Sequence, residues 1–380
     1  MANLPVKWYD YRFHGLPKLS GTPGTLTDIL DCILVDGFGT TNIVTASVTD
    51  KKATLVLEEG FGFFARSVVA LAGFTDSSLN TEYRVISSGP GVLTVEMDVP
   101  NGPLTLNNAK VKYAPLGWIK VFSDVSKRVY KPSKVDALEW VFYIDDTRAT
   151  WAEIKIGEQA LSISSLTNKR PYNFTMGWPK NQYANTAVKK FGIVGDPYCF
   201  YYKTDGIVNT DFNQGALYFV GQSKKLFNES IDNFNVFVSG KTDNWNDLYI
   251  NPRDIFINSG SNILSLRDHH GIKNEIYNYT TVRSTSNWSG YSSNNLFSND
   301  NFRLLFTDNY FYSSDRRVTI IPGMVTSNSH VSGNSFDYFF AAEDNTLNRE
   351  LILVRSCDHL EYAHINSNRH YYFDITGPWR

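Results

Sequence analysis

Residues 20–39 read SGTPGTLTDILDCILVDGFG and carry the one clearly helical pattern in a chain whose other patterns are those of β-strands. Apolar side chains recur at every third or fourth position, as they do on the buried face of a helix. These residues are Leu26, Ile29, Leu30, Ile33 and Leu34. We expect them to pack against strands from beyond residue 115, with Thr27, Asp28 and Asp31 pointing away from that contact.

The ends of this helix also have sequence signals. Thr22 followed by Pro23 predicts the start, because threonine is a good N-cap and proline suits the first helical position. Gly37 or Gly39 predicts the end, since glycine readily adopts the left-handed conformation that stops a helix.

After Gly39 the pattern changes to short runs that alternate between apolar and polar residues and are separated by glycine and proline turns. Such spacing is typical of a small sandwich or barrel. The predicted strands are 42–48, 53–57, 67–72, 83–87, 92–99 and 109–113. We expect residues 43–114 to form a small inserted β domain.

From Pro115 onward, further alternating runs predict a larger body. The expected strands are 118–122, 128–131, 140–145, 152–156, 216–220, 235–239, 254–257, 263–267, 317–321, 336–342, 350–355 and 371–375. Residues 193–201 and 305–312 share a plan in which an aspartate closes a hairpin turn. The predicted fold is mainly β: an antiparallel sandwich or barrel-like body of 1–42 and 115–380, with one N-terminal helix.

Bulk composition excludes several classes of partner. A net charge of -2 and a pI of about 6.4 argue against a nucleic-acid-binding protein. No apolar run is long enough for a membrane span, and the first residues lack a secretion signal, so we expect no membrane partner and a cytoplasmic product. Three distant cysteines do not indicate a disulfide framework.

The sequence carries no pattern for an active site or a cofactor. Nucleophile-elbow, phosphate-loop and zinc-protease motifs are missing. The histidines near the end, His359, His364 and His370, have spacings that match no zinc pattern, and surface histidines explain them better. The neighbouring carboxylates Asp145 and Asp146 fit a turn better than a glycosidase site. We therefore expect no enzyme, no cofactor and no metal.

Aromatic residues make up 14% of the chain and favour large protein contacts. Residues 165–190 and 284–301 read as polar surface loops, and the tryptophans within them are expected to be exposed. The candidate interface residues are Trp8, Tyr9, Trp178, Trp288, Tyr291 and Trp379. The same rings could instead stack on sugars.

Several phrases carry a resemblance: LPVKW at 4–8, GLPKLSGT at 15–22, the helix with DGFG at 36–39, and GWIKVF at 117–122. Together with residues 141–147 and 194–201, they resemble a family of tailed-bacteriophage and prophage proteins labelled virion structural. Leu79-Asn80 resembles a turn phrase of small phage β modules, with Thr81 where glycine is usual.

The resemblance covers much of residues 1–220 and implies a place rather than a reaction. It implies a non-enzymatic structural protein of the tail, baseplate or neck, located in the virion after assembly in the host cytoplasm. Its partners would be further copies of itself in a symmetric oligomer and other virion proteins. The alternatives are a tail appendage that binds a receptor or host surface glycan, and a capsid decoration protein.

Overall fold

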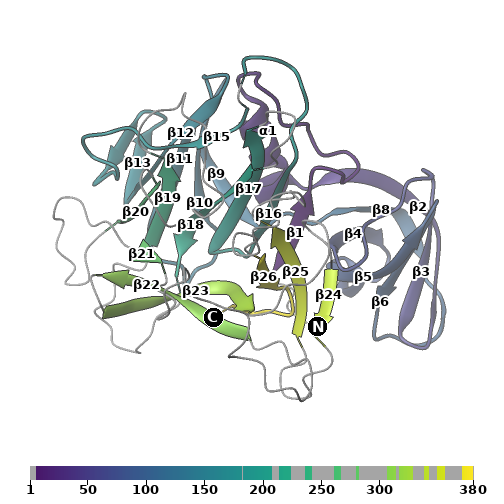
Figure 1. The fold of residues 1–380 in the computed structure, drawn as a ribbon. Helices are drawn as coiled ribbons and strands as arrows, with labels where there is room; N and C mark the ends of the chain where they lie inside the picture. The colour runs from purple at the N-terminus through teal and green to yellow at the C-terminus, as the bar shows by residue number, and fades with distance from the viewer. Residues whose placement is uncertain are drawn as a thin grey trace.

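A computed structural model describes residues 6–181, 183–207, 214–223, 236–241, 261–266, 280–281, 306–313, 316–327, 338–341, 349–355 and 370–379. The fold is mainly β, as predicted, with a curled sheet, a six-stranded barrel and a helix near the N-terminus (Figure 1). A further six-stranded sheet holds the described strands of the C-terminal part.

The body is an antiparallel sheet in the order β1-β16-β17-β18-β19-β15-β12-β11-β10-β9, with β20 beside β19. Its strands are β1 (Lys7–Asp10), β9 (Trp118–Asp124), β10 (Lys127–Pro132), β11 (Val141–Asp145), β12 (Trp151–Gly157), β15 (Gly177–Pro179), β16 (Phe191–Gly195), β17 (Cys199–Ile207), β18 (Gln214–Gln222), β19 (Val236–Lys241) and β20 (Ser261–Ser265). The ring of Phe200 on β17 lies 5.4 Å from that of Trp118 on β9 and 5.9 Å from that of Phe142 on β11. Strands far apart in the order thus meet, because the sheet curls around an aromatic interior.

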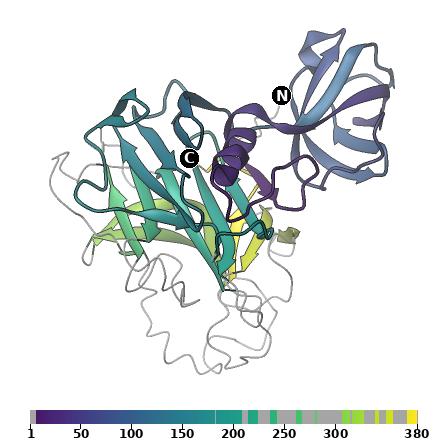
Figure 2. The ribbon, with the colours of Figure 1, turned by 90° about the horizontal axis from the view of Figure 1, so that it is seen from above.

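A closed barrel stands to one side of the body (Figures 1 and 2). Its strands are β2 (Phe38–Thr49), β3 (Lys52–Leu57), β4 (Val68–Phe74), β5 (Glu82–Gly89), β6 (Val92–Glu96), β7 (Gly102–Pro103) and β8 (Leu106–Tyr113). The order β3-β6-β5-β4-β8-β2 closes because β2 also pairs with β3. Each of the six predicted runs between residues 42 and 113 overlaps a strand of this barrel, although the run 92–99 extends beyond β6, which ends at Glu96.

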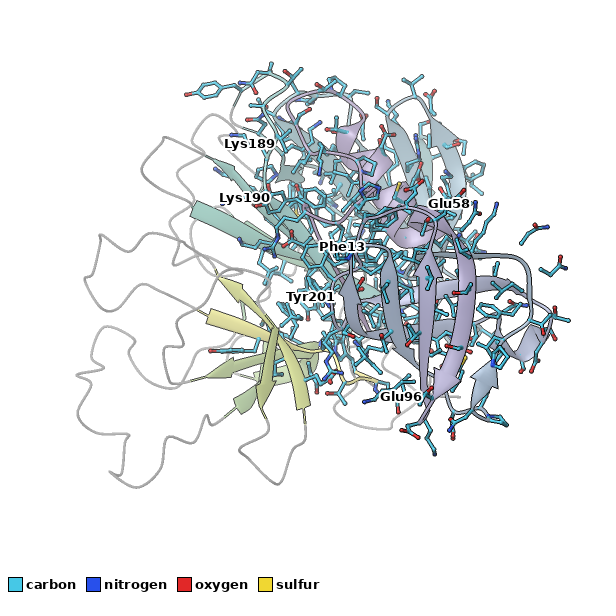
Figure 3. All side chains as sticks on the ribbon, turned by 90° about the vertical axis from the view of Figure 1, so that its right-hand side faces the viewer. Phe13, Glu58, Glu96, Lys189, Lys190 and Tyr201 are labelled. Carbon is cyan, nitrogen blue, oxygen red and sulfur yellow. The ribbon has the colours of Figure 1, made fainter. Side chains whose placement is uncertain are left out.

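The C-terminal sheet packs on β17. Its strands are β21 (Thr280–Thr281), β22 (Phe306–Ser313), β23 (Arg316–Ser327), β24 (Tyr338–Ala341), β25 (Arg349–Arg355) and β26 (His370–Asp374). Tyr201, labelled in Figure 3, donates its hydroxyl to the carbonyl of Pro322 at 2.6 Å, and its ring lies 4.6 Å from that of Phe373. A small hairpin of β13 (Gln159–Ser162) and β14 (Ser165–Thr167) lies apart from this sheet.

One predicted hairpin is confirmed and the other is wrong. Asp196 closes the turn between β16 and β17 by accepting from the backbone N–H of Tyr198 at 2.8 Å and of Cys199 at 2.9 Å. Asp308, by contrast, lies within the continuous strand β22, where a bulge follows it. The shared sequence pattern formed a turn at Asp196, where the strands on either side, β16 and β17, pair with each other. At Asp308 the same pattern continues as one strand. The predicted strand 254–257 lies outside the described residues.

The N-terminal helix has the predicted buried face. Helix α1 (Thr25–Leu30) continues directly as a π-helix, η1 (Asp31–Asp36), and all five aliphatic residues of the face are fully buried. The backbone N–H of Leu116 donates to the carbonyl of Ile33 at 2.8 Å, which attaches the helix to the segment before β9. Gly37, with φ of +71°, ends it as predicted.

The predicted start of this helix is wrong. Gly24 is the N-cap residue. The backbone N–H groups of the first helical turn are bonded by a residue from a distant part of the chain. The carboxylate of Asp146 accepts from the backbone N–H of Leu26 at 2.8 Å and of Thr27 at 3.4 Å. Thr27 and Asp31, expected to point away from the body, are buried as well. The body surrounds more of the helix than a single face.

The arm before the helix is the edge strand β1, which pairs with β16. From it, Tyr9 donates to the carbonyl of Ala114 at 2.6 Å, and Lys7 forms an ion pair with Glu82 of the barrel at 2.7 Å. Phe13, labelled in Figure 3, stacks between Phe64 and Tyr113 with ring centroids 4.5 and 4.6 Å away. Barrel and body are thus joined through a buried aromatic contact.

Candidate interaction surface

The structure contradicts the exposure expected of the aromatic candidates. Trp8, Tyr9, Trp178 and Trp379 are all buried within the chain. Trp178 lies on β15 rather than in a surface loop, and its indole N–H donates to the carbonyl of Ser239 at 2.8 Å. The four rings pack inside the curled sheet or between it and the neighbouring barrel and C-terminal sheet. They therefore do not present a surface to a partner.

The other two candidates, Trp288 and Tyr291, lie outside the described residues. The exposed apolar side chains that the structure does describe are mostly aliphatic. Three of them gather on the barrel: Val44, Val56 and Val92, which are 57%, 39% and 39% exposed. No sequence expectation pointed to these three.

Strand register places two of these valines side by side, and the third, Val44, directly precedes Thr45, which is also in the register. Val56 on β3 lies directly opposite Val92 on β6, and also opposite Thr45 on β2. Thr54, two residues earlier on β3, lies opposite Thr94. We call this set the valine–threonine face, made of Val44, Thr45, Thr54, Val56, Val92 and Thr94.

The face exists because the inward positions of the same strands fill the barrel. Leu55, Leu57, Leu93 and Val95 point inward and are buried, so their neighbours in the chain point outward. The six outward residues of the face are all β-branched, which suits a flat pleated surface, and none of the six is charged. A surface that has aliphatic side chains and few charged residues is typical of the core of a protein–protein interface.

Charged residues mark one edge of the face. Lys52 and Glu96 lie opposite each other at the next outward position and are both exposed. This end of the barrel is distal to the body, since β2 leaves the body at Phe38 and β8 returns at Tyr113. Figure 3 shows Glu58 and Glu96 at opposite ends of the barrel. A polar rim thus borders an uncharged centre, as in many interfaces.

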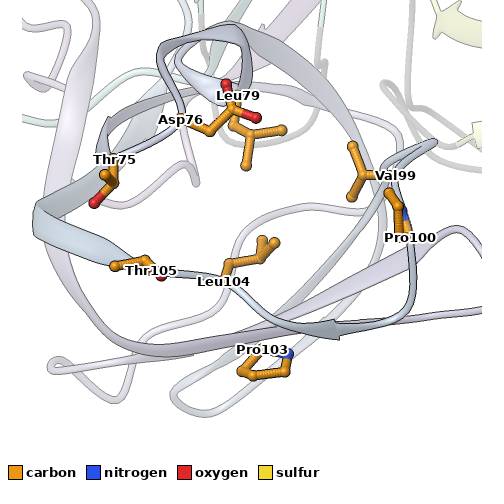
Figure 4. Close-up of a pocket in the computed structure, with 8 residues that line it drawn as sticks. All are labelled: Thr75, Asp76, Leu79, Val99, Pro100, Pro103, Leu104 and Thr105. Atoms are coloured by element: carbon orange, nitrogen blue, oxygen red, sulfur yellow. The ribbon is translucent and has the colours of Figure 1, made fainter.

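A pocket of about 330 Å³ opens at the distal end of the barrel (Figure 4). Its lining residues are Thr75, Asp76, Leu79, Val99, Pro100, Pro103, Leu104 and Thr105. Asp76 accepts from the backbone N–H of Ser78, and hydrogen bonding to Ser78 lowers the pKa of that carboxyl. The lining contains no aromatic ring, so the pocket offers no platform for stacking a sugar.

The neighbouring carboxylates do not form a catalytic pair. Asp145 accepts from the backbone N–H and the hydroxyl of Thr147 in a local turn. Asp146 is fully buried beneath the helix. Within the described ranges, no group of three or more histidine, cysteine, aspartate or glutamate side chains could hold a metal ion. His359 and His364 lie outside those ranges.

No helix in the described part of the chain is long and apolar enough to cross a membrane. Comparison of the sequence with protein-family models and with curated proteins finds no match. The valine–threonine face combines uncharged outward positions from three strands, β2, β3 and β6. The sequence alternation in β2, β3 and β6 could have identified its members, whereas only the register shows that they adjoin.

Proposed function

We propose that this chain is a non-enzymatic structural protein of a tailed bacteriophage or prophage virion, acting in the tail, baseplate or neck through protein–protein contacts. The observation that carries the contact function is the valine–threonine face of the barrel. The phage assignment rests on the sequence resemblance at residues 4–8, 15–39 and 117–122.

The position of the face suits assembly. The barrel stands to one side of the body, and its outer wall presents Val44, Val56 and Val92 without a charged residue between them. A partner that covers this wall would bury aliphatic surface without the cost of desolvating a charge. A second copy of the chain, or another virion protein with a similar uncharged surface, has the required chemistry.

Particles purified from the phage or induced prophage that encodes this chain are expected to contain it. In those particles, Val56→Lys should lower incorporation roughly tenfold, because a lysine at the centre of an apolar contact costs more than 1 kcal/mol. Val135→Lys is the matched control, since Val135 is fully exposed and lies outside the face. Both variants should fold, because both positions are on the surface.

Absence of the protein from purified particles would overturn the virion proposal. Equal incorporation of the two variants would exclude the valine–threonine face as the contact. Binding of the isolated protein to a glycan array would favour the receptor-binding appendage instead.

A further inference from the structure

Asp146 and Lys180 form an ion pair in which neither residue is exposed to solvent. The pair lies beneath the start of α1, where the ends of β11 and β15 converge. Nζ of Lys180 is in direct contact with Oδ1 of Asp146. Among the described residues, Lys180 is the charged group that acts on Asp146, and Asp146 is the charged group that acts on Lys180.

The second carboxyl oxygen of Asp146 accepts hydrogen bonds from backbone N–H groups, as the carbonyl oxygen of a substrate does in the oxyanion hole of an acyl-transfer enzyme. Oδ2 accepts two backbone N–H groups, from Leu26 at 2.8 Å and Thr27 at 3.4 Å. Two such donors stabilise negative charge that develops on an oxygen during attack at its carbon. The backbone of Asp146 is fixed as well, by hydrogen bonds to Ser126 at 2.8 Å and from Gly24 at 3.0 Å.

The amine of Lys180 is positioned for the same reaction. Nζ donates to the carbonyl of Thr22 at 3.1 Å, and the backbone N–H of Lys180 donates to Thr150 at 2.9 Å. Burial raises the pKa of Asp146 to about 6 and lowers the pKa of Lys180. Both shifts favour the uncharged pair, which is a nucleophilic amine beside a carboxylic acid.

We propose that Lys180 and Asp146 condense to form an intramolecular amide crosslink. Nζ of the neutral amine attacks Cγ of the protonated carboxyl, and a C–N bond forms. The negative charge on Oδ2 is held by the N–H groups of Leu26 and Thr27. One proton passes from Nζ to Oδ1, the Cγ–Oδ1 bond breaks, and Oδ1 leaves with both protons as water.

This step balances without an oxidant, a reductant or a co-reactant. It replaces two buried charges with one neutral amide, which removes their desolvation cost. It also closes a covalent ring through residues 146–180. The ring joins the end of β11 to the end of β15 beneath the start of α1.

Mass spectrometry of the intact folded protein tests the proposal. The mass is expected to be one water lower than that calculated from the sequence. A tryptic digest is expected to contain a branched peptide that joins residues 135–148 to the segment spanning Lys180, with no cleavage after Lys180. An intact mass equal to the sequence mass would overturn the crosslink.

Three variants separate the crosslink from other losses of water, such as succinimide formation at an Asp-Gly step. Lys180→Met should restore the full mass, whereas Lys7→Met, which removes a buried lysine paired with Glu82, should retain the loss. Asp146→Asn should expel ammonia in place of water and so give the same crosslinked mass as the wild type. A loss of water without the branched peptide would also overturn the proposal. Because the wild-type map is decisive alone, misfolding of Lys180→Met would not leave the question open.

Discussion

Cys32 shows how position within the helix controls the chemistry of a single side chain. It lies on η1 and is half-buried, whereas Cys199 is fully buried in β17. Burial raises the pKa of the Cys32 thiol to about 11 from an ordinary 9.0, and the carboxylates of Asp36, Asp31 and Asp28 add to this effect. The thiolate, which is the reactive form, is therefore scarce at neutral pH.

Alkylation of Cys32 by iodoacetamide should accordingly be slow in the folded protein. Below pH 9 its rate is expected to be about a hundredfold lower than that of an ordinary cysteine, because the thiolate fraction falls tenfold per unit of raised pKa. The rate should keep rising with pH until about 11. Peptide mapping after timed labelling measures it, with the urea-unfolded chain as control. A rate that levels off near pH 9 would contradict the shift.

At the scale of elements, Asp31 attaches the helix to the body by polar contacts in addition to its apolar face. Its carboxylate forms ion pairs with Lys120 of β9 at 3.0 Å and with Arg128 of β10 at 2.9 Å. It also accepts from the hydroxyl of Tyr130 at 2.7 Å. Burial, and then the charge of Asp31, hold the pKa of Tyr130 well above its usual range, so the tyrosine remains a donor.

Asp31→Ala should lower the free energy of unfolding by about 3 kcal/mol, because it leaves two partly buried cations without their shared partner. Asp28→Ala is the matched control on the same helix. Asp28 is 60% exposed in its side chain and lies 3.9 Å from Arg128, so its loss should change stability by less than about 0.5 kcal/mol. Urea unfolding of both variants measures the difference. Equal losses would show that Asp31 is not an anchor.

At the scale of the whole molecule, the barrel is held to the rest of the chain by contacts with the N-terminal arm and with the C-terminal sheet. Phe13 packs it against the N-terminal arm. Arg66 of the barrel forms an ion pair with Glu350 of β25 at 3.1 Å, and Arg84 donates to the carbonyl of Ile375 at 2.7 Å. We therefore expect barrel and body to unfold together.

Phe13→Ala should separate the two parts. Removing a fully buried ring costs about 3 to 5 kcal/mol, and here the loss falls on the junction rather than on either core. Calorimetry is expected to show one unfolding transition for the wild type and two for the variant. Phe61→Ala serves as control, since Phe61 is half-buried and stacks on the exposed His14. Two transitions in the wild type would contradict the coupling.

The sequence determined the features that depend on neighbours in the chain. Alternation of side chains located the strands of the barrel, and the spacing from Leu26 to Leu34 located the buried face of the helix. Asp196 closed its predicted turn by bonding backbone only two and three residues away. Such interactions are complete within a few residues, so a local pattern is sufficient to predict them.

The tertiary structure decided the features that depend on distant segments. Asp146 caps a helix 120 residues before it in the chain, so Thr22 and Pro23 were not needed as the start. Trp178 is buried because the sheet curls over it. Val56 and Val92 became one surface only when β3 and β6 paired. Burial, capping and shared faces are set by which remote strands meet, and periodicity within one segment does not contain that information.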